Sequence, residues 1–245
     1  MNLLIDMGNS RLKWAMSGKG VIQTSHALSN HQLNAQNLRE AWADLQPQGV
    51  YIACVGATPL LAIVQSVVAN LWQGLDIMMA KSTAQAFGVQ NAYAQAEKLG
   101  VDRWLAVLAA TRLYNGAVCV IDCGTAITID VVDAQGVHQG GLISTGLNLM
   151  QTALNKATQQ LPIITQQQTI TEFTLANNTQ AAIAQGTLAM AVGFIDYVMA
   201  QLVSSEITFL ITGGDAQSIS AHLKQSVIID NDLVLRGLAL IAEEN

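Results

Sequence analysis

The chain carries the same short pattern twice: an Asp-x-Gly turn followed by polar or small side chains, over residues 6–10 and again over residues 122–126. Each pattern lies between two apolar-rich runs, which predicts a tight turn between two strands. Glycine at such a turn lets backbone N–H groups approach a polyanion, a hydroxyl adds a donor, and an aspartate can hold a hard cation directly or through water. One Asp-x-Gly is common in ordinary turns, but two in matching contexts indicate a pair of turns that bind the phosphates of a nucleotide such as ATP.

The first turn supplies the candidate ligands of the N-terminal half. Asp6 is suited to Mg²⁺ through a bridging water, and Gly8, Asn9 and Ser10 can present donors to phosphate oxygens. Lys13 can add an ammonium group to the same phosphates, or it can be a solvated strand residue, since exposure is the default for lysine. The usual P-loop motif does not occur in the sequence.

A third candidate is the segment Thr212-Gly213-Gly214-Asp215-Ala216, which lies between an apolar run and a helical pattern. Paired glycines there, Gly213 and Gly214, let the chain pass close over a flat ligand such as adenine. A lone Thr-Gly-Gly is more often an ordinary strand-to-helix turn. In company with both Asp-x-Gly turns, the nucleotide interpretation is favoured.

Asp102 and Arg103 stand at the start of an otherwise apolar helical pattern. An acid in the first turn of a helix can be there only because the helix dipole favours it. The functional alternative assigns Asp102 as the base that accepts a proton from a substrate hydroxyl, and Arg103 as the partner of an anionic substrate group. The sequence alone leaves both interpretations open.

Composition narrows the class of protein. Of 245 residues, 51% are hydrophobic and 11% are charged, where a soluble domain typically carries ~25% charged residues. A large buried core and an oligomer are therefore expected. The net charge of −6 and the lack of a basic stripe argue against nucleic-acid binding.

The sequence predicts a cytoplasmic protein without a membrane span. The N-terminal segment has no basic leader, and three cysteines without a Cys-x-x-Cys pair suit a reducing compartment. The longest apolar stretch, 181–203, is interrupted by Gln185, Asp196 and Gln201, which favours a core helix over a membrane helix.

Hydrophobic periodicity predicts three strands followed by alternating helices and strands, and this order occurs twice. The expected fold class is therefore α/β, with a first domain at 1–115 and a second at 116–245. The expected strands are 2–6, 12–17, 21–25, 50–55, 75–79, 117–121, 126–132, 137–143, 207–211 and 227–229. The expected helices are 30–45, 59–72, about 99–114, 147–158, 179–203, one from about 216, and 232–243.

Five motifs in this order resemble the type III pantothenate kinases, members of the actin, Hsp70 and sugar-kinase superfamily. They are residues 6–10, 100–104, 122–130, 140–146 and 212–216, and the resemblance runs over essentially the whole chain. It implies two duplicated RNase H-like domains, with mixed sheets flanked by helices and an ATP cleft between them. It also implies ATP-dependent phosphorylation of pantothenate to 4'-phosphopantothenate, the first step of coenzyme A biosynthesis, by a homodimer that needs Mg²⁺ and a monovalent cation (K⁺ or NH₄⁺).

The resemblance also implies roles for individual residues. Asp102 matches the proton acceptor within a substrate-binding segment made of Gly100, Val101, Asp102 and Arg103, in which Arg103 suits the pantothenate carboxylate. Asp122 matches the ligand of the monovalent cation, and Thr125 matches a residue that contacts ATP.

Tyr93 and Thr179 match positions that line the pantothenate pocket, and residues 6–13 match the first phosphate loop. Two positions depart from the family pattern: Ser10 stands where Thr is usual, which keeps the hydroxyl, and Thr145 stands where Pro is usual, which removes a rigid turn residue.

Three other functions share parts of this pattern. A sugar or acetate kinase of the same superfamily would use the same ATP-binding turns with another acceptor. A non-catalytic ATP-binding module would keep the turns without needing Asp102 or Arg103. A filament-forming actin relative would need larger inserted subdomains than 245 residues allow.

Overall fold

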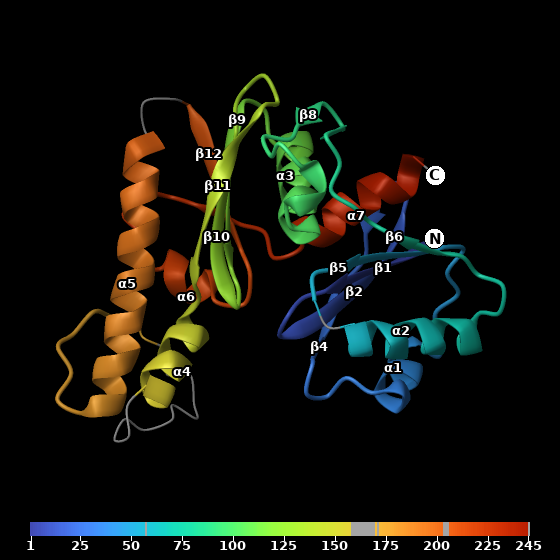
Figure 1. Cartoon of the computed structure of the whole chain (residues 1–245), viewed down its shortest axis with the longest axis horizontal. Coiled ribbons are helices and arrows are strands. Elements are labelled where there is room, and N and C mark those ends of the chain that lie inside the picture. Colours follow the sequence, from blue (N-terminus) through green and yellow to red (C-terminus); the bar gives the residue numbers. More distant parts are fainter. Residues whose placement is uncertain (57, 158–169, 171, 203–205, 245) are drawn as a thin grey trace. The chain divides into compact units, whose positions relative to one another are not determined.

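A computed structural model describes residues 1–56, 58–157, 170, 172–202 and 206–244 (Figure 1). The chain forms two compact units. Unit 1 contains Met1–Leu113 together with Asp232–Asn245, and unit 2 contains Tyr114–Asn231. The division predicted from the sequence placed all of 116–245 in the second domain. In the structure the C-terminal segment Asp232–Asn245 belongs to unit 1 instead.

Unit 1 is built on a mixed six-stranded sheet. Its strands are β1 (Asn2–Met7), β2 (Arg11–Gly18), β3 (Val21–Ile22), β4 (His26–Ser29), β5 (Val50–Cys54) and β6 (Ile77–Met79). They lie in the order β3-β2-β1-β5-β6, and β4 also pairs with β2. β1 is antiparallel to β2 and parallel to β5, and β5 is parallel to β6.

Helices cover both faces of this sheet. The helices are α1 (Ala35–Trp42), α2 (Thr58–Leu71), α3 (Val101–Leu113) and α7 (Leu233–Glu244). α1 and α2 lie on one face of the sheet (Figure 1). Their side chains Leu38, Trp42 and Val67 belong to one apolar core with strand residues such as Leu3 and Ile5. α7 contacts β1, β2 and β5, and it also packs along α3.

The contact between α7 and α3 explains why the C-terminal helix belongs to unit 1. A Cβ on Gly237 would collide with the backbone of Leu105, so only glycine lets the two helices approach this closely. Leu235 and Leu238 of α7 are fully buried in the same region. Periodicity predicted the helix correctly, but it carries no signal for which half of the chain the helix packs against.

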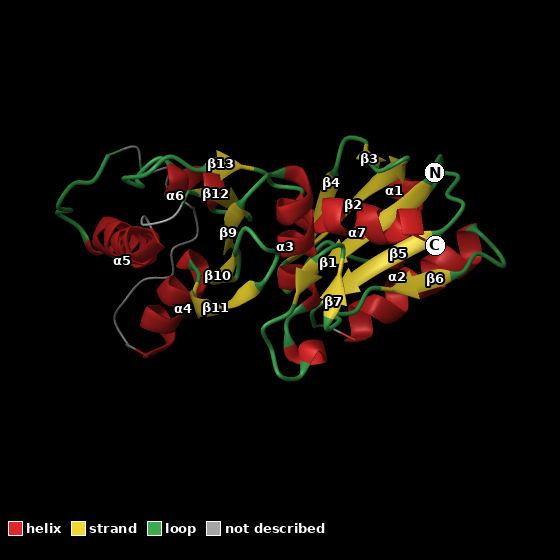
Figure 2. Ribbon diagram, turned by 90° about the horizontal axis from the view of Figure 1, so that it is seen from above, coloured by secondary structure: helices red, strands yellow, loops and turns green. Residues whose placement is uncertain are grey.

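A short segment before α3 was not expected to form strands. β7 (Gln85–Ala86), labelled in Figure 2, and β8 (Val89–Gln90), labelled in Figure 1, make a tight antiparallel hairpin. The 3₁₀ turn η1 (Ala96–Lys98) follows it. The two residues at the hairpin tip, Phe87 and Gly88, have φ of 48° and 81°. Positive φ at both central residues is the geometry of a type I′ turn, which matches the twist of the flanking strands.

Unit 2 repeats the sheet order of unit 1. Its strands are β9 (Ala117–Cys123), β10 (Ala126–Val132), β11 (His138–Thr145), β12 (Ile207–Thr212) and β13 (Ile228–Ile229), in the order β11-β10-β9-β12-β13. As in unit 1, the first hairpin is antiparallel and the next two pairings are parallel. The duplication predicted from the sequence is therefore present at the level of strand order.

Three helices pack on one face of this second sheet: α4 (Leu147–Ala157), α5 (Thr179–Leu202) and α6 (Ala216–Ser220). Among the described residues, α5 is the helix that is long and apolar enough to cross a membrane, and 39% of its most apolar window is buried in the structure. Leu188, Ile195 and Met199 of α5 lie in the core of unit 2 with Ile121 and Ile129 of the sheet, which supports the interpretation of α5 as a core helix.

Two expected elements differ from the structure near residue 30. The expected strand 21–25 is split into β3 and β4, and the expected helix 30–45 begins only at Ala35. Asn34 is the N-cap, since its side chain accepts a hydrogen bond from the Asn37 N–H. The expected C-terminal residues of two helices, Thr158 and Val203, lie outside the described residues.

Candidate functional site

The first Asp-x-Gly turn connects β1 to β2, as the sequence predicted. The Gly8 N–H donates to the Arg11 carbonyl oxygen at 3.1 Å, which closes the turn. Asn9 and Ser10 are exposed at its tip, whereas Gly8 is half-buried. The turn therefore presents small polar residues to solvent from a rigid strand edge, as a phosphate-binding turn requires.

Asn30 anchors this turn, and it was not identified from the sequence. Its side-chain amide donates to the carbonyl oxygens of Gly8, at 3.0 Å, and of Asn9, at 2.9 Å. Its backbone N–H donates to the Ser10 carbonyl oxygen at 2.9 Å. Three bonds from one residue fix the backbone of the turn, which makes its geometry independent of a ligand.

Asp6 and Lys13 are direct partners across the β1–β2 hairpin, so their side chains lie on the same face of the sheet. Lys13 Nζ also lies 3.6 Å from Asp232 Oδ1, directly before α7, and the two side chains are only 20% and 24% exposed. Lys13 is therefore a half-buried, ion-paired lysine placed beside the turn. This environment differs from the fully solvated strand residue that the sequence left as an alternative.

The second Asp-x-Gly turn connects β9 to β10 in unit 2. The Gly124 N–H donates to the Ala126 carbonyl oxygen at 3.0 Å, and Thr125 is exposed at the tip. The Gly146 N–H donates to the Thr125 carbonyl oxygen at 3.0 Å, so the end of β11 supports the turn. Thr145 pairs with Ala126 as the last residue of β11, so the position where the family usually has proline is extended strand here.

The Thr-Gly-Gly loop packs directly against this second turn. Thr212 is the parallel partner of Asp122, so the carboxyl ends of β12 and β9 meet at the same edge of the sheet. The Asp215 N–H donates to the Cys123 carbonyl oxygen at 3.0 Å. Gly213 has φ of +98°, and a Cβ there would lie 2.5 Å from the carbonyl atoms of Cys123 and would also meet Asp122 Oδ1. Glycine is therefore required by both conformation and space.

The pKa of the Cys123 thiol is affected by the negative charges at this edge of the sheet. Burial raises the pKa of its thiol well above the ordinary range, and the nearby carboxylates of Asp122 and then Asp215 raise it further. Two carboxylates thus act on one buried sulfur from neighbouring loops. Oxygen ligands and negative charge are what K⁺ and Mg²⁺ require, and Asp122 is the residue expected to supply them in this unit.

The described residues contain no group of three or more His, Cys, Asp or Glu suited to a metal ion. The residues expected to bind metal are the half-buried carboxylates of Asp6 in unit 1 and Asp122 in unit 2. Mg²⁺ in nucleotide sites is commonly held by one or two carboxylates together with phosphates and waters. A single carboxylate at each turn fits that mode of binding.

The start of α3 gathers the predicted substrate residues Asp102, Arg103 and Tyr93. Asp102 Oδ1 accepts a hydrogen bond from the Arg103 backbone N–H at 2.8 Å. The Arg103 side chain is only 7% exposed. Its Nη1 donates to Tyr93 Oη at 3.1 Å, and its guanidinium lies 5.9 Å from the centre of the Tyr93 ring. The structure thus joins Tyr93 to Arg103, and the role of Tyr93 in a pantothenate pocket stays a prediction.

Gly100 precedes Asp102 and leaves room for its carboxylate. A Cβ on Gly100 would lie 2.7 Å from Asp102 Oδ1. The Gly100 carbonyl oxygen accepts the first bond of the helix, from the Trp104 N–H at 2.9 Å, and Val101 is buried. Both Asp102 interpretations remain compatible with this geometry, since the residue is in the first turn of α3 and is half-buried.

Thr179, the other predicted pocket residue, lies in unit 2. It is exposed at the first turn of α5. The residue before it, Asn178, accepts a hydrogen bond from the Ala181 N–H at 2.9 Å and so caps the helix.

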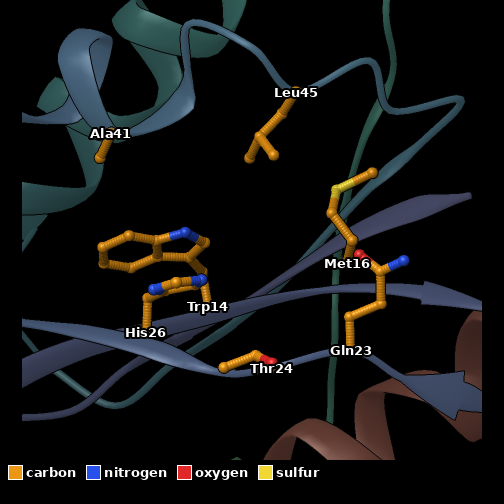
Figure 3. A pocket seen from close by; sticks show the side chains of 7 residues that line it. All are labelled: Trp14, Met16, Gln23, Thr24, His26, Ala41 and Leu45. Atoms are coloured by element: carbon orange, nitrogen blue, oxygen red, sulfur yellow. The ribbon is translucent and has the colours of Figure 1, made fainter.

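A cavity of about 210 Å³ in unit 1 contains none of the predicted site residues. Trp14 and His26 stack along one side, with Ala41 and Leu45 facing them (Figure 3). Trp14 follows Lys13 on β2, and successive strand residues point to opposite faces. The cavity therefore lies on the other side of the sheet from the Asp6–Lys13 pair.

Comparison with known proteins identifies relatives over the whole chain. The sequence model of the type III pantothenate kinase family matches residues 2–201. A type III pantothenate kinase of Nitrosococcus oceani is 38% identical over 255 residues, covering 100% of this chain and 94% of the relative. One from a Marinomonas species is 33% identical over 243 residues, covering 99% and 95%.

Solved structures show the same fold at low identity. A Campylobacter jejuni protein of the Baf transcriptional activator family is 20% identical, with a TM-score of 0.59 and coverage of 99% and 98%. A ROK family glucokinase of Streptomyces griseus is 11% identical, with a TM-score of 0.52 and coverage of 100% and 99%. These likenesses show that the chain has the same mixed α/β fold, in agreement with the fold class predicted from the sequence.

Proposed function

Because the chain belongs to the type III pantothenate kinase family, we propose that it transfers the γ-phosphoryl group of ATP to the terminal hydroxyl of pantothenate. The product is 4'-phosphopantothenate, in the first step of coenzyme A biosynthesis. The observation that carries the proposal is the start of α3, where a half-buried carboxylate stands next to a buried arginine.

Arg103 recognises the pantothenate carboxylate. Its guanidinium is a planar fork of donors, which suits a carboxylate because the two groups can form parallel hydrogen bonds. Tyr93 Oη accepts a hydrogen bond from Arg103 Nη1 at 3.1 Å, and a guanidinium carries five N–H donors in all. This contact with the Tyr93 phenol restricts the orientation of the Arg103 guanidinium, so the guanidinium favours a carboxylate that approaches from one direction.

Asp102 accepts the proton of the substrate hydroxyl. Its Oδ1 is held by the Arg103 N–H, so one carboxylate oxygen is fixed by the backbone of the helix. A fixed carboxylate next to the arginine that binds the far end of the substrate can orient the hydroxyl for attack.

Each unit contributes one turn to phosphate binding. In unit 1, Asn9, Ser10 and Lys13 contact phosphate oxygens and Asp6 holds Mg²⁺ through water. In unit 2, Thr125 contacts ATP, Asp122 holds the monovalent cation, and Gly213 and Gly214 lie against the adenine. Bound Mg²⁺ and K⁺ supply charge neutralisation for the transferring phosphoryl group.

The protein acts as a cytoplasmic homodimer. Unit 2 exposes large apolar side chains that a second copy could cover: Ile143 at 64%, Leu175 at 92%, Met190 at 66% and Tyr197 at 69%. Large exposed apolar side chains are often covered at a protein interface. With its acidic net charge of −6, the chain has no nucleic-acid partner in this proposal.

A coupled ADP-release assay with and without pantothenate tests the proposal. We expect ADP release to depend on pantothenate, and Asp102→Asn to lower kcat by about a hundredfold or more, near the low end for loss of a general base. The variant should fold and bind ATP as the wild type does, because the amide keeps the size of the carboxylate. Full activity in Asp102→Asn would remove the assignment of the base.

A further inference from the structure

The position of Tyr93 is set by a segment with little regular structure. Tyr93 follows the β7–β8 hairpin and precedes η1, so no long helix or strand holds it. Its ring and hydroxyl nevertheless meet the Arg103 guanidinium at 5.9 Å and 3.1 Å. Something in the segment must therefore fix the phenol, because a mobile phenol could not orient a buried arginine.

Asn91 makes the bonds that fix this segment. Its Oδ1 accepts a hydrogen bond from the Tyr93 N–H at 2.9 Å. Its Nδ2 donates to the carbonyl oxygens of Thr83, at 3.1 Å, and Ala96, at 3.4 Å. Its backbone N–H donates to the Ala84 carbonyl oxygen at 2.9 Å. One half-buried side chain thus joins the chain before the hairpin, the backbone of Tyr93 and the start of η1.

The segment is also tied to the loop before α3. The Ser82 hydroxyl, which is buried, donates to the Leu99 carbonyl oxygen at 2.8 Å. The two ends of residues 82–99 are therefore held together, and Asn91 bridges the middle. Closing such a loop at both places restricts where Tyr93 can lie relative to Arg103.

We infer that Asn91 is a positioning residue for the acid-binding part of the substrate site, acting through Tyr93 on Arg103. This inference rests on the proposed function, because it takes Arg103 as the partner of the pantothenate carboxylate. In this inference Asn91 acts on the site through Tyr93 and not by binding the substrate or ATP itself. Its effect should therefore appear in the affinity for pantothenate.

Removing the side chain leaves an N–H and two carbonyl groups without these bonds, and each loss loosens the segment. Asn91→Ala should raise the KM for pantothenate about tenfold, which corresponds to about 1.4 kcal/mol. The KM for ATP should stay within about twofold of the wild type, since the change does not reach the phosphate turns. Asn91→Asp keeps the acceptor for the Tyr93 N–H but sets a carboxylate oxygen against the two carbonyl oxygens that Nδ2 binds, so its KM for pantothenate should also rise.

Asn70→Ala is a matched control. Asn70 also donates through Nδ2 to a backbone carbonyl, that of Ser66 at 2.7 Å, but on the exposed side of α2. This variant should leave both KM values unchanged. Melting temperatures of all variants separate a loosened site from a general loss of folded protein.

Tyr93→Phe completes the experiment, because it removes the hydroxyl that Arg103 contacts. If Asn91 acts through Tyr93, the double variant Asn91→Ala/Tyr93→Phe should raise the KM for pantothenate much less than the product of the two single effects. The inference would be overturned if the double variant raised the KM for pantothenate by the full product of the two single effects. It would also be overturned if Asn91→Ala changed the KM for pantothenate and the KM for ATP equally, or left the KM for pantothenate unchanged. Should Asn91→Ala not fold, the same comparison is made with Asn91→Asp.

The experiment separates failure of the inference from failure of the proposed function. A wild-type protein without pantothenate-dependent ADP release would overturn both. An active wild-type protein with an unaffected Asn91→Ala variant would overturn the inference alone.

Discussion

Gly213→Ala is the sharpest test of how the Thr-Gly-Gly loop packs on the Asp-x-Gly turn of unit 2, the two loops that we propose bind ATP. Gly213 has φ of +98°, and its Cβ would lie 2.5 Å from both carbonyl atoms of Cys123. A left-handed backbone costs about 1–2 kcal/mol for a residue with a Cβ. The overlap is about 1 Å deep against normal carbon contacts of ~3.5–4.0 Å, and forcing extra atoms into packed surroundings costs about 1–3 kcal/mol.

The sum predicts a loss of about 2–5 kcal/mol in the free energy of unfolding. For a chain of this size each kcal/mol lowers the Tm by about 2–4 °C, so the Tm should fall by roughly 5–20 °C. The same clash pushes against Asp122 Oδ1. We therefore also expect a higher KM for ATP in the fraction that stays folded.

Gly116→Ala is the control for this variant. Gly116 has φ of +83°, but nothing lies within 4 Å of its Cβ position. It should show the backbone cost of about 1–2 kcal/mol alone. The assay is thermal unfolding of both variants and the wild type, followed by ATP titration at a temperature where all are folded. If Gly213→Ala is no less stable than Gly116→Ala, the packing of the loop on Cys123 is not as described.

Three further predictions follow from other parts of the structure. Asn30→Ala removes two side-chain hydrogen bonds to the first turn, and each such bond contributes about 1 kcal/mol. The KM for ATP should therefore rise roughly threefold to tenfold, with little change in the KM for pantothenate. An unchanged KM for ATP would show that the turn keeps its shape without Asn30. Burial, and to a lesser extent Asp130, raise the pKa of the Cys119 thiol from its ordinary 9.0 to about 12. Between these two pH values the native state keeps the thiol proton and the unfolded chain releases it. The free energy of unfolding is therefore unaffected by this group below pH 9, and it falls between pH 9 and 12 by about 1.4 kcal/mol per pH unit. Urea unfolding at pH 8 and pH 10 should thus show a smaller pH dependence in Cys119→Ala than in the wild type, and equal dependence would mean that the thiol titrates normally. Replacing K⁺ by Na⁺ should lower kcat if Asp122 holds a monovalent cation, and Asp122→Asn should abolish the difference between the two salts; equal rates in both salts with the wild type would argue against that role.

The duplicated sheet could be predicted because each half repeats a strong local signal. Both halves begin with an apolar strand, an Asp-x-Gly turn and a second strand, and the strand order of the two sheets agrees. The start of α3 was also predictable, since Gly100 and Asp102 give a typical beginning of a helix. These features depend on neighbours in sequence, which is why the sequence reveals them.

The features that were missed depend on contacts distant in sequence or on unusual backbone angles. The helix 30–45 was predicted too long because Asn30 bonds to the first turn, and nothing near Asn30 in sequence indicates this contact. The β7–β8 hairpin was missed because Phe87, a bulky residue, has positive φ, where Asn or Asp would have been a recognisable turn signal. α7 was given to the wrong half because its partner α3 lies far away in the sequence.

The candidate site residues also fall into those that neighbours in sequence make predictable and those that depend on contacts distant in sequence. Asp6, Asp102, Asp122 and Gly213 were predictable as residues of recognisable turns and helix starts. Asn91 and Asp232 were not, because each acts on a predicted residue through a contact that only the folded chain makes. Residues that position others carry little signal in a single sequence.

The most direct test of the central claim is a ³¹P NMR spectrum of the product formed by the purified protein from ATP, Mg²⁺, K⁺ and pantothenate. If the protein phosphorylates the terminal hydroxyl, a phosphate monoester resonance should appear as ATP is converted to ADP, and it should couple to the two protons of a CH₂ group. Inorganic phosphate alone, or no loss of the ATP signals, would contradict the account.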